Sequence, residues 1–286
     1  MTTESGLVVV DKPGGMTSHD VVARVRRLAG TRKVGHAGTL DPMATGVLVL
    51  GLNRATRLLG HLTLTDKRYD ATIRLGVTTT TDDAEGEVVG THPTDAVTAD
   101  DVRRVLASYV GEIDQVPSAV SAIKVDGKRA YARVRAGEDV DLPARRVTVH
   151  AIEVTALDLP EVEIAVHCSS GTYIRAIARD LGAALGVGGH LTALRRTAVG
   201  PFGLADAHTL DALADDLRLT PIAEAARASF PAVDLDEAHA ADVRVGRRLD
   251  LALDETTALF APDGEFLALY REGEDGRARA VAVFTS

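Results

Sequence analysis

The apolar positions of the chain follow two patterns, short continuous runs and strict alternation. Leu7–Val10, ended by Pro-Gly-Gly, and Val47–Leu52 are continuous runs, and each predicts a short strand. Apolar residues alternate with polar ones over Tyr69–Leu75, 145–157 and 161–170. Alternation is typical of a strand with one buried face, and the last two segments predict an antiparallel pair.

Three segments show helical spacing instead. The segment 16–30 starts with Thr17 as a candidate N-cap and stops at Gly30, and a threonine also opens the segment 98–110. After Gly171, four apolar residues share one face of a predicted helix: Ile174, Ile177, Ala178 and Leu181.

Two further segments complete the outline. The segment 121–137 predicts a hairpin-like turn at Asp126-Gly127 followed by a helix. Residues 236–286 predict a short helix and several short strands, which is enough for a small β-rich appendage. The length of 286 residues fits one large domain with such an appendage.

Composition places the protein among ordinary soluble chains. Hydrophobic residues make up 45% and charged residues 26%, and no apolar run is long enough to span a bilayer. The N-terminus lacks the basic and long apolar regions of a secretory signal. The single cysteine, Cys168, excludes an internal disulfide framework. We therefore expect a cytoplasmic protein with no membrane partner.

Net charge alone argues against a nucleic-acid partner, but its distribution does not. The formal charge is −9, yet residues 1–80 carry 11 lysines and arginines against 6 acidic residues. The acidic excess lies in two segments: residues 81–120 carry 2 basic against 9 acidic residues, and residues 201–286 carry 8 against 17. A polyanion is held by a local basic patch, so the sequence remains compatible with RNA binding.

Several motifs that carry chemistry are absent from the sequence. There is no GxxxxGK[ST] phosphate loop, no GxGxxG loop opening a helix and no GxSxG nucleophile motif. The nine histidines show no zinc-ligand spacing. His167 and Cys168 are neighbours on a predicted strand, so their side chains point to opposite faces. We therefore expect no metal, no nucleotide cofactor and no other cofactor.

The segment 35–51 places a lone carboxylate in a constrained loop. Its sequence is GHAGTLDPMATGVLVLG, in which Pro42 biases Asp41 toward an extended backbone and nearby glycines allow close approach to a ligand. Such a loop suits the rigid presentation of one carboxylate. On spacing alone, however, an aspartate that accepts backbone N–H groups in a turn is the stronger interpretation.

Two tyrosines and an arginine lie where strands and helices begin. Tyr173 and Arg175 enter a predicted helix directly after a strand, a position from which Arg175 can hold a carboxylate ionised by bidentate pairing. Tyr69 follows a basic pair at a strand start, where its ring can stack on a base. The alternatives are an exposed arginine and a tyrosine packed at a strand start.

Five motifs, in this order and at these separations, favour the functional interpretation of these residues over the structural one. They are DKPGGMTSHDVV, KVGHAGTLDPMATGVLVL, DKRYDATIRLG, CSSGTYIRAIARDLG and HLTALRRTAVG. Together they resemble the TruB family of tRNA pseudouridine synthases over about residues 5–215. The resemblance implies isomerisation of uridine 55 in the T loop of tRNA, with the T stem-loop as the partner.

The resemblance also implies a fold and a division of the chain. The fold is the α+β pseudouridine synthase fold, a mixed and mostly antiparallel sheet flanked by helices. Residues 1–230 would form the catalytic domain and 231–286 a small PUA-like C-terminal domain. That second segment is short and acidic, so we expect it to serve structure more than RNA binding. A monomer is the default expectation.

The matched positions imply roles for individual residues. Asp41 is the implied catalytic aspartate, Arg175 is its ion-pair partner, and Tyr69 stacks on the target base. Tyr173 and Leu194 would line the uracil pocket.

Other matched residues surround this set. His36 would contact the flipped-out nucleotide region of the T loop, and Lys12 would support the active-site loop through local packing. Basic side chains are candidates for phosphate contacts, and we expect strong salt sensitivity of RNA binding. These candidates are Arg24, Arg32, Lys33, Lys67, Arg68, Lys124, Lys128 and Arg195, with Arg27, Arg129 and Arg196 beside them.

Chemistry explains why one carboxylate is enough. Cleavage of the N1–C1′ bond develops positive charge on the sugar, and uracil leaves as a delocalised anion, so no second acid is needed. The base must first leave its stack. Burial raises the pKa of Asp41 and Arg175 lowers it, so we expect the pair to keep Asp41 ionised. Attack on C1′ and removal of a sugar proton both remain open for Asp41.

Two other protein classes stay as alternatives. One is a non-catalytic tRNA-binding protein or folding chaperone on the same scaffold, and the other is an unrelated glycosidase. The intact set of Asp41, Tyr69 and Arg175 argues against the first, and the lack of a visible second acid argues against the second. Ser118 and Val120 depart from the usual proline and aromatic residue of the family, which puts the local packing of that loop in doubt.

Overall fold

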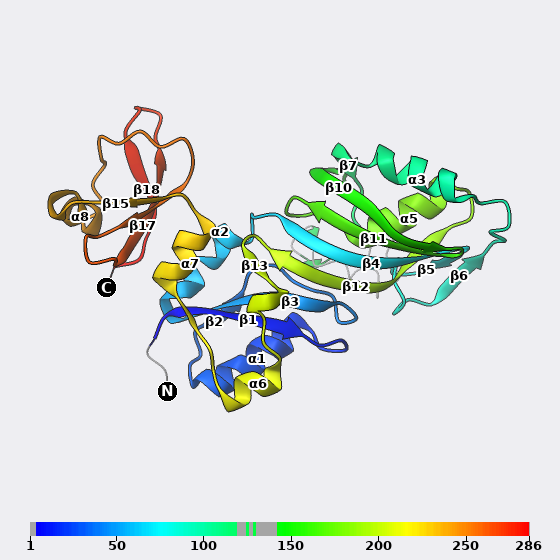
Figure 1. Ribbon diagram of the computed structural model, residues 1–286, viewed down its shortest axis with the longest axis horizontal. Helices are drawn as coiled ribbons and strands as arrows, with labels where there is room; N and C mark the ends of the chain where they lie inside the picture. Colours follow the sequence, from blue (N-terminus) through cyan, green and yellow to red (C-terminus); the bar gives the residue numbers. More distant parts are fainter. Residues whose placement is uncertain (1–3, 119–123, 126–127, 130–141, 286) are drawn as a thin grey trace.

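The computed structural model describes residues 4–118, 124–125, 128–129 and 142–285, and most of its strands form one long sheet (Figure 1). Ten strands belong to this sheet within the described residues. Eight of them follow one another in the spatial order β14 (Thr220–Pro221), β1 (Gly6–Lys12), β3 (Thr45–Leu52), β12 (Gly189–Val199), β4 (Lys67–Leu75), β11 (Glu161–Cys168), β10 (Arg145–Asp158) and β7 (Gly111–Gln115). The other two are β2 (Val34–His36), paired with β3, and β13 (Phe202–Gly203), paired with β12.

The sheet is mixed and mostly antiparallel. Among its described pairs, only β3 and β12 run parallel, through Arg195↔Thr45 and Arg196↔Gly46. The α+β class and the predicted antiparallel pair, now β10 and β11, are confirmed. The parallel junction lies directly after the loop that carries Asp41.

The two sequence patterns correspond to two kinds of strand. In β1, Leu7 and Val9 pack into one apolar core while Val8 and Val10 pack into another, so the strand is buried on both faces. A strand buried on both sides is a continuous apolar run. In β4 only alternate side chains are buried, as the alternation from Tyr69 predicts.

Helices cover one face of the sheet and supply part of its first core. Their residues pack in the cluster that contains Val8 and Leu50. These helices are α1 (Ser18–Ala29), α3 (Ala99–Ser108), α5 (Ile174–Ala184) and α6 (Leu210–Asp215). As predicted, α1 opens with a capping box of Thr17 and Asp20 and ends at Gly30 in the left-handed conformation.

The C-terminal segment forms a small four-stranded sheet at one end of the molecule (Figure 1). Its elements are β15 (Ala232–Asp234), α8 (Glu237–Arg244), β16 (Thr257–Phe260), β17 (Phe266–Glu272) and β18 (Ala278–Val283). Phe260, Phe266 and Phe284 join the second core of the large sheet, which also contains Leu62. The Arg54 Nη1 donates a hydrogen bond to the carbonyl of Phe284 at 3.2 Å. The appendage predicted from the sequence is therefore packed onto the rest of the chain.

Short elements complete the fold. They are α2 (Leu59–Leu62), α7 (Ile222–Ser229), the 3-10 turns Asn53–Arg57 and Leu204–Asp206, the pair β5 (Val77–Thr79) and β6 (Val88–Thr91), and the pair β8 (Lys124–Val125) and β9 (Lys128–Arg129). Pairing of β8 with β9 agrees with the predicted hairpin. The turn at Asp126-Gly127, the helix predicted after it and Val120 lie outside the described residues.

Gly46 permits the parallel junction, and a side chain there should break it. Gly46 has a φ of 96°, and a Cβ on it would lie 2.2 Å from the Arg196 carbonyl oxygen. Gly15 has a similar φ of 79° but open space around it. Both alanine variants carry the same conformational strain, so the difference between them isolates the clash.

We expect Gly46→Ala to reduce the free energy of unfolding by at least about 2 kcal/mol more than Gly15→Ala does. Urea unfolding monitored by circular dichroism measures both losses. Equal losses would show that β3 and β12 have room to separate.

Candidate active site

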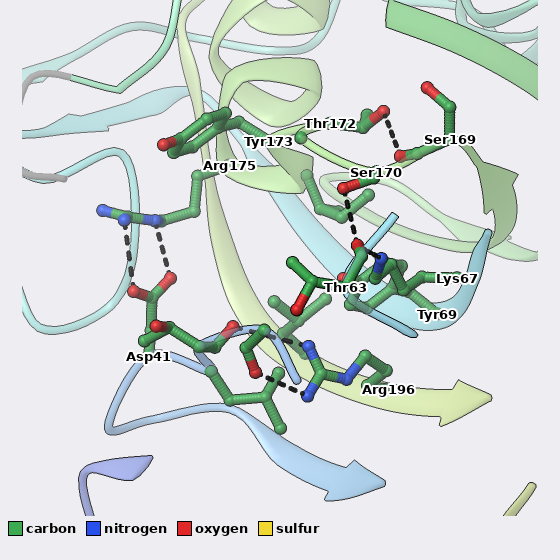
Figure 2. Close-up of a pocket in the computed structure, with 16 residues that line it drawn as sticks. Asp41, Thr63, Lys67, Tyr69, Ser169, Ser170, Thr172, Tyr173, Arg175 and Arg196 are labelled. Carbon is green, nitrogen blue, oxygen red and sulfur yellow. Dashed lines mark hydrogen bonds and ion pairs between the residues drawn. The ribbon is translucent and has the colours of Figure 1, made fainter. Parts of the chain in front are cut away.

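The predicted site residues meet in one cavity of about 290 Å³ (Figure 2). Four segments surround it: the loop 38–41 before β3, the stretch 63–69 that leads into β4, the stretch 169–175 that leads into α5, and part of β12. Five of the six residues predicted to be catalytic or substrate-binding line it, namely Asp41, Tyr69, Tyr173, Arg175 and Leu194. The sheet thus gathers residues from widely separated motifs.

Asp41 and Arg175 form the bidentate ion pair that the resemblance implies. The Arg175 Nε lies 3.0 Å from Asp41 Oδ2, and its Nη2 donates to Oδ1 at 3.3 Å (Figure 2). The Arg175 side chain is 6% exposed, whereas that of Asp41 is 36% exposed. The guanidinium is therefore enclosed by protein, and the carboxylate keeps a face that a ligand can reach.

A second carboxylate, missed by the sequence analysis, holds the other side of the guanidinium. The Arg175 Nη1 lies 3.2 Å from Asp83 Oδ2 and donates to the carbonyl of Thr81 at 2.9 Å. The Asp83 side chain is only 4% exposed and accepts the backbone N–H of Glu85 at 3.1 Å. Its motif, the acidic turn after β5, resembles an ordinary solvated loop, so spacing gives no signal of this role.

The electrostatics of Asp41 follow from this arrangement. Burial raises the pKa of Asp41, the Arg175 guanidinium lowers it, and the nearby Asp83 raises it again. The pKa lies above its usual value, because one arginine serves two carboxylates in a poorly solvated site. Arg175 limits the rise and favours the ionised form of Asp41.

Buried cations fix the loop that carries Asp41. The Lys12 ammonium donates to the carbonyls of Pro13, Met16 and Pro42 at 2.9, 2.7 and 3.1 Å. Burial lowers the pKa of Lys12 to about 8. The expected support of the loop by Lys12 thus takes the form of hydrogen bonds to its backbone.

Arg196 and Ser18 hold the same loop from other sides. The fully buried Arg196 donates to the carbonyls of Gly38 and Val47 at 3.1 and 2.7 Å. Ser18 exchanges two hydrogen bonds with the backbone of Leu40, at 2.9 and 3.1 Å. Arg196, which the sequence analysis counted among candidate phosphate contacts, is instead an internal clamp.

Tyr69, Leu194 and Tyr173 form the walls of the cavity. Tyr69 and Leu194 lie on the adjacent strands β4 and β12, and both are largely buried. Burial raises the pKa of the Tyr69 phenol, so it is neutral at physiological pH. Tyr173 is held at the start of α5 by Gln115, whose side chain accepts its N–H at 2.8 Å and donates to its carbonyl at 3.0 Å.

His36 lies apart from the cavity lining. It ends β2, and its ring makes an edge contact with that of His19, 5.8 Å between centroids. Burial lowers the pKa of His36, and its Nδ1 is buried without a hydrogen-bond partner in the described structure. The expected contact of His36 with a flipped-out nucleotide stays a prediction.

The basic residues predicted to contact phosphates differ in exposure. Arg32, Lys33 and Arg68 are exposed, while Arg24 and Arg195 border a second hollow beside α1. For Lys124 and Lys128 only the strand pairing is described.

Two of these basic residues are already engaged. Arg195 makes a bidentate contact with Asp11, at 2.8 and 3.0 Å. Lys67 is buried, and its ammonium donates to the carbonyls of Thr63 and Thr65. Lys67 was expected to contact a phosphate. In the structure its ammonium is buried and already donates hydrogen bonds to these carbonyls.

Family models match the chain in three consecutive parts. The N-terminal domain of the TruB family pseudouridylate synthases matches residues 26–174. The tRNA pseudouridylate synthase B C-terminal domain matches 175–227, and the C-terminal part of tRNA pseudouridine synthase II matches 230–285. None of the helices in the described part of the chain has the length and apolar character that a membrane span requires.

Similar proteins cover nearly the whole chain. A tRNA pseudouridine synthase B of Arthrobacter sp. (strain FB24) is 57% identical, over 98% of this chain and 96% of its own. One of Mycobacterium sp. (strain KMS) is 60% identical, over 97% and 95%. Among solved structures, a chain of a Cbf5-Nop10-Gar1 complex superposes with a TM-score of 0.76 at 28% identity, over 98% of this chain and 85% of that one.

Fold and cavity together define an RNA-modifying isomerase of the pseudouridine synthase class. The chain belongs to the TruB family of pseudouridine synthases.

The raised pKa of Asp41 has a consequence for stability. A carboxyl group whose pKa is higher in the folded than in the unfolded state binds protons more tightly when folded. Its contribution to stability therefore falls as pH rises from the unfolded pKa, about 3.9, to the folded value. In the variant Asp41→Asn the asparagine does not titrate. The Arg175 guanidinium still pairs with Asp83.

We expect the melting temperature of Asp41→Asn, relative to wild type, to be higher at pH 7 than at pH 4. Scanning calorimetry at both values measures the difference. Asp254→Asn, at an exposed position, controls for the loss of one charge. The raised pKa of Asp41 would be contradicted if the melting temperature of Asp41→Asn, relative to wild type, were lower at pH 7 than at pH 4.

Proposed function

We propose that the protein isomerises uridine 55 in the T loop of tRNA to pseudouridine, with Asp41 as the catalytic residue. The observation that carries the proposal is the partly exposed Asp41 carboxylate, fixed by Arg175 at the wall of the cavity. The relatives named tRNA pseudouridine synthase B support tRNA as the substrate.

The cavity suits a nucleobase taken out of its stack. It offers the Tyr69 ring and the Leu194 side chain as apolar walls, and base-modifying enzymes hold an extruded base by such contacts. Once its bond to the sugar is broken, uracil must turn over without escaping. The apolar walls of Tyr69 and Leu194 hold the detached base in the cavity without fixing one orientation of it.

The reaction balances with one carboxylate and no cofactor. The N1–C1′ bond breaks, the C5–C1′ bond forms, the proton on C5 is lost to solvent, and N1 gains a proton. No electrons or groups pass to a second molecule. Asp41 can act on the sugar either as a nucleophile at C1′ or as an acceptor of a sugar proton.

The position of Asp83 argues against a glycosidase. A glycosidase needs a second carboxyl group facing the substrate to protonate the leaving group or activate water. Asp83 is the second acid at this ion pair, but it is almost fully buried and bound to Arg175. It positions the arginine and does not face the cavity lining.

Two arginines, the half-buried Arg24 and the exposed Arg27, supply the proposed tRNA surface. Arg24 and Arg27 lie on α1 and border the second hollow, next to the Lys12 segment that supports the Asp41 loop. We expect phosphates of the T stem-loop to lie along this face. We expect residues 1–230 to act as the catalytic unit, with residues 231–286 packed against it.

Release of tritium from uridine C5 tests the proposed reaction. With tRNA transcripts tritiated at uridine C5, we expect the wild type to release one equivalent per tRNA and Asp41→Asn to release none. Mapping of the product should place the pseudouridine at position 55. We expect Arg175→Met to lower kcat by about 10²-fold or more, because it removes the charge that keeps Asp41 ionised.

Tight tRNA binding by a wild type that releases no tritium would reject the proposal in favour of the RNA-binding or chaperone alternative. Release that continues in Asp41→Asn would remove Asp41 from the mechanism. Release mapped to another uridine would reject only the assigned position.

Salt dependence tests the proposed tRNA surface. We expect Arg24→Ala/Arg27→Ala to weaken tRNA binding and to lower the slope of log Kd against log salt by about 1 for each lost phosphate contact. The matched control is Arg103→Ala/Arg104→Ala, which removes two exposed arginines of α3 that pair with Asp100 and Asp101. Equal slopes for the two double variants would place the tRNA elsewhere.

A further inference from the structure

Three potential metal ligands converge on the outer face of the large sheet. The Nε2 atoms of His150 and His167 lie 3.2 and 3.5 Å from the same oxygen, Oδ2 of Asp66. Candidate ligand atoms of the three residues all lie within 4.8 Å of one another. The three side chains are 36%, 28% and 47% exposed, in the order His150, His167 and Asp66, so an ion can reach them from solvent.

The pairing of β10 with β11 brings the two histidines together. Val149 and Cys168 form a pair and are fully buried on the inner face. His150 follows Val149 and His167 precedes Cys168, so alternation places both histidines on the outer face. Their rings lie 4.6 Å apart between centroids, at a bulge in which His150 is the extra residue.

Asp66 reaches the same place from the next strand. It directly precedes β4, in which Arg68 pairs with His167. The carbonyl of Asp66 accepts the N–H of Gly200 at 2.9 Å, which ties down its backbone. Three neighbouring segments of the sheet therefore fix the three ligands in advance of any ion.

The spacing of these atoms fits a tetrahedral ion. Zinc binds imidazole nitrogen and carboxylate oxygen at about 2.0–2.2 Å, which places tetrahedral ligands about 3.4 Å apart. The two nitrogen–oxygen separations in the cluster are 3.2 and 3.5 Å. We propose that Asp66, His150 and His167 bind a divalent transition-metal ion, best suited to zinc, with the fourth position open to water.

The competing explanation is a pair of imidazolium–carboxylate contacts, in which both histidines share one Asp66 oxygen without an ion.

The proposed site adjoins segments that line the cavity, and it is independent of the proposed reaction. Asp66 adjoins Lys67, and His167 lies shortly before Ser169, both of which line the cavity. No residue of the proposed site is one that the reaction uses. Failure of one proposal therefore leaves the other standing.

Metal titration of the tag-free, chelator-treated full chain at pH 7.5 tests the proposal. We expect one equivalent of zinc by calorimetry, and one equivalent of cobalt(II) with the visible absorption of a tetrahedral ion. His150→Ala, His167→Ala and Asp66→Ala should each weaken binding by at least about tenfold. Melting temperatures without metal check that each variant is folded, as expected for exposed side chains.

His239→Ala is the matched control, because His239 lies 2.8 Å from Asp236 in an exposed histidine–aspartate pair without a second histidine. It should bind zinc as the wild type does. The proposal is overturned if the wild type binds no zinc, if the three variants bind as tightly as wild type, or if His239→Ala alone abolishes binding.

Discussion

A single buried guanidinium between two carboxylates determines how this site works. Arg175 pairs with Asp41 on one side and with Asp83 and the Thr81 carbonyl on the other. A buried charge is costly unless it is fully paired, and these contacts meet that need. Because the trio keeps one negative charge in excess, Asp41 is less well neutralised than in an isolated pair. That imbalance leaves a carboxylate available for chemistry on a substrate.

Two other buried cations hold the backbone of the Asp41 loop. Lys12 and Arg196 donate to carbonyls on both sides of Asp41, and Ser18 adds two bonds to Leu40. A loop can hardly bury its own polar groups, so these donors supply the missing partners. The position of the Asp41 carboxylate is thus set by several independent contacts. Such fixation suits a reaction whose geometry tolerates little error.

The sequence predicted most of the strands and helices because each follows from local patterning. Thr17 and Gly30 bounded α1 as expected, and the alternation from Tyr69 predicted β4. The resemblance of the motifs then predicted that Asp41 and Arg175 form an ion pair, which their spacing in the sequence alone did not predict. Asp83 was missed because its role depends on where a turn after β5 meets α5.

The histidines at positions 150 and 167 escaped prediction for a related reason. Their proximity depends on the register in which β10 pairs with β11. Spacing along the chain carries no trace of it. Long-range pairing, bulges and turn contacts are the features that local rules leave undetermined.

Asp41 and Arg175 are 134 positions apart along the chain, and this separation matters during synthesis. At translation rates of 5–20 residues per second, the arginine leaves the ribosome about 7–27 s after the aspartate. Until then the loop has no ion pair, and without Arg196 it also lacks its internal clamp. The nascent chain therefore passes through a period in which the N-terminal strands exist without a functioning centre.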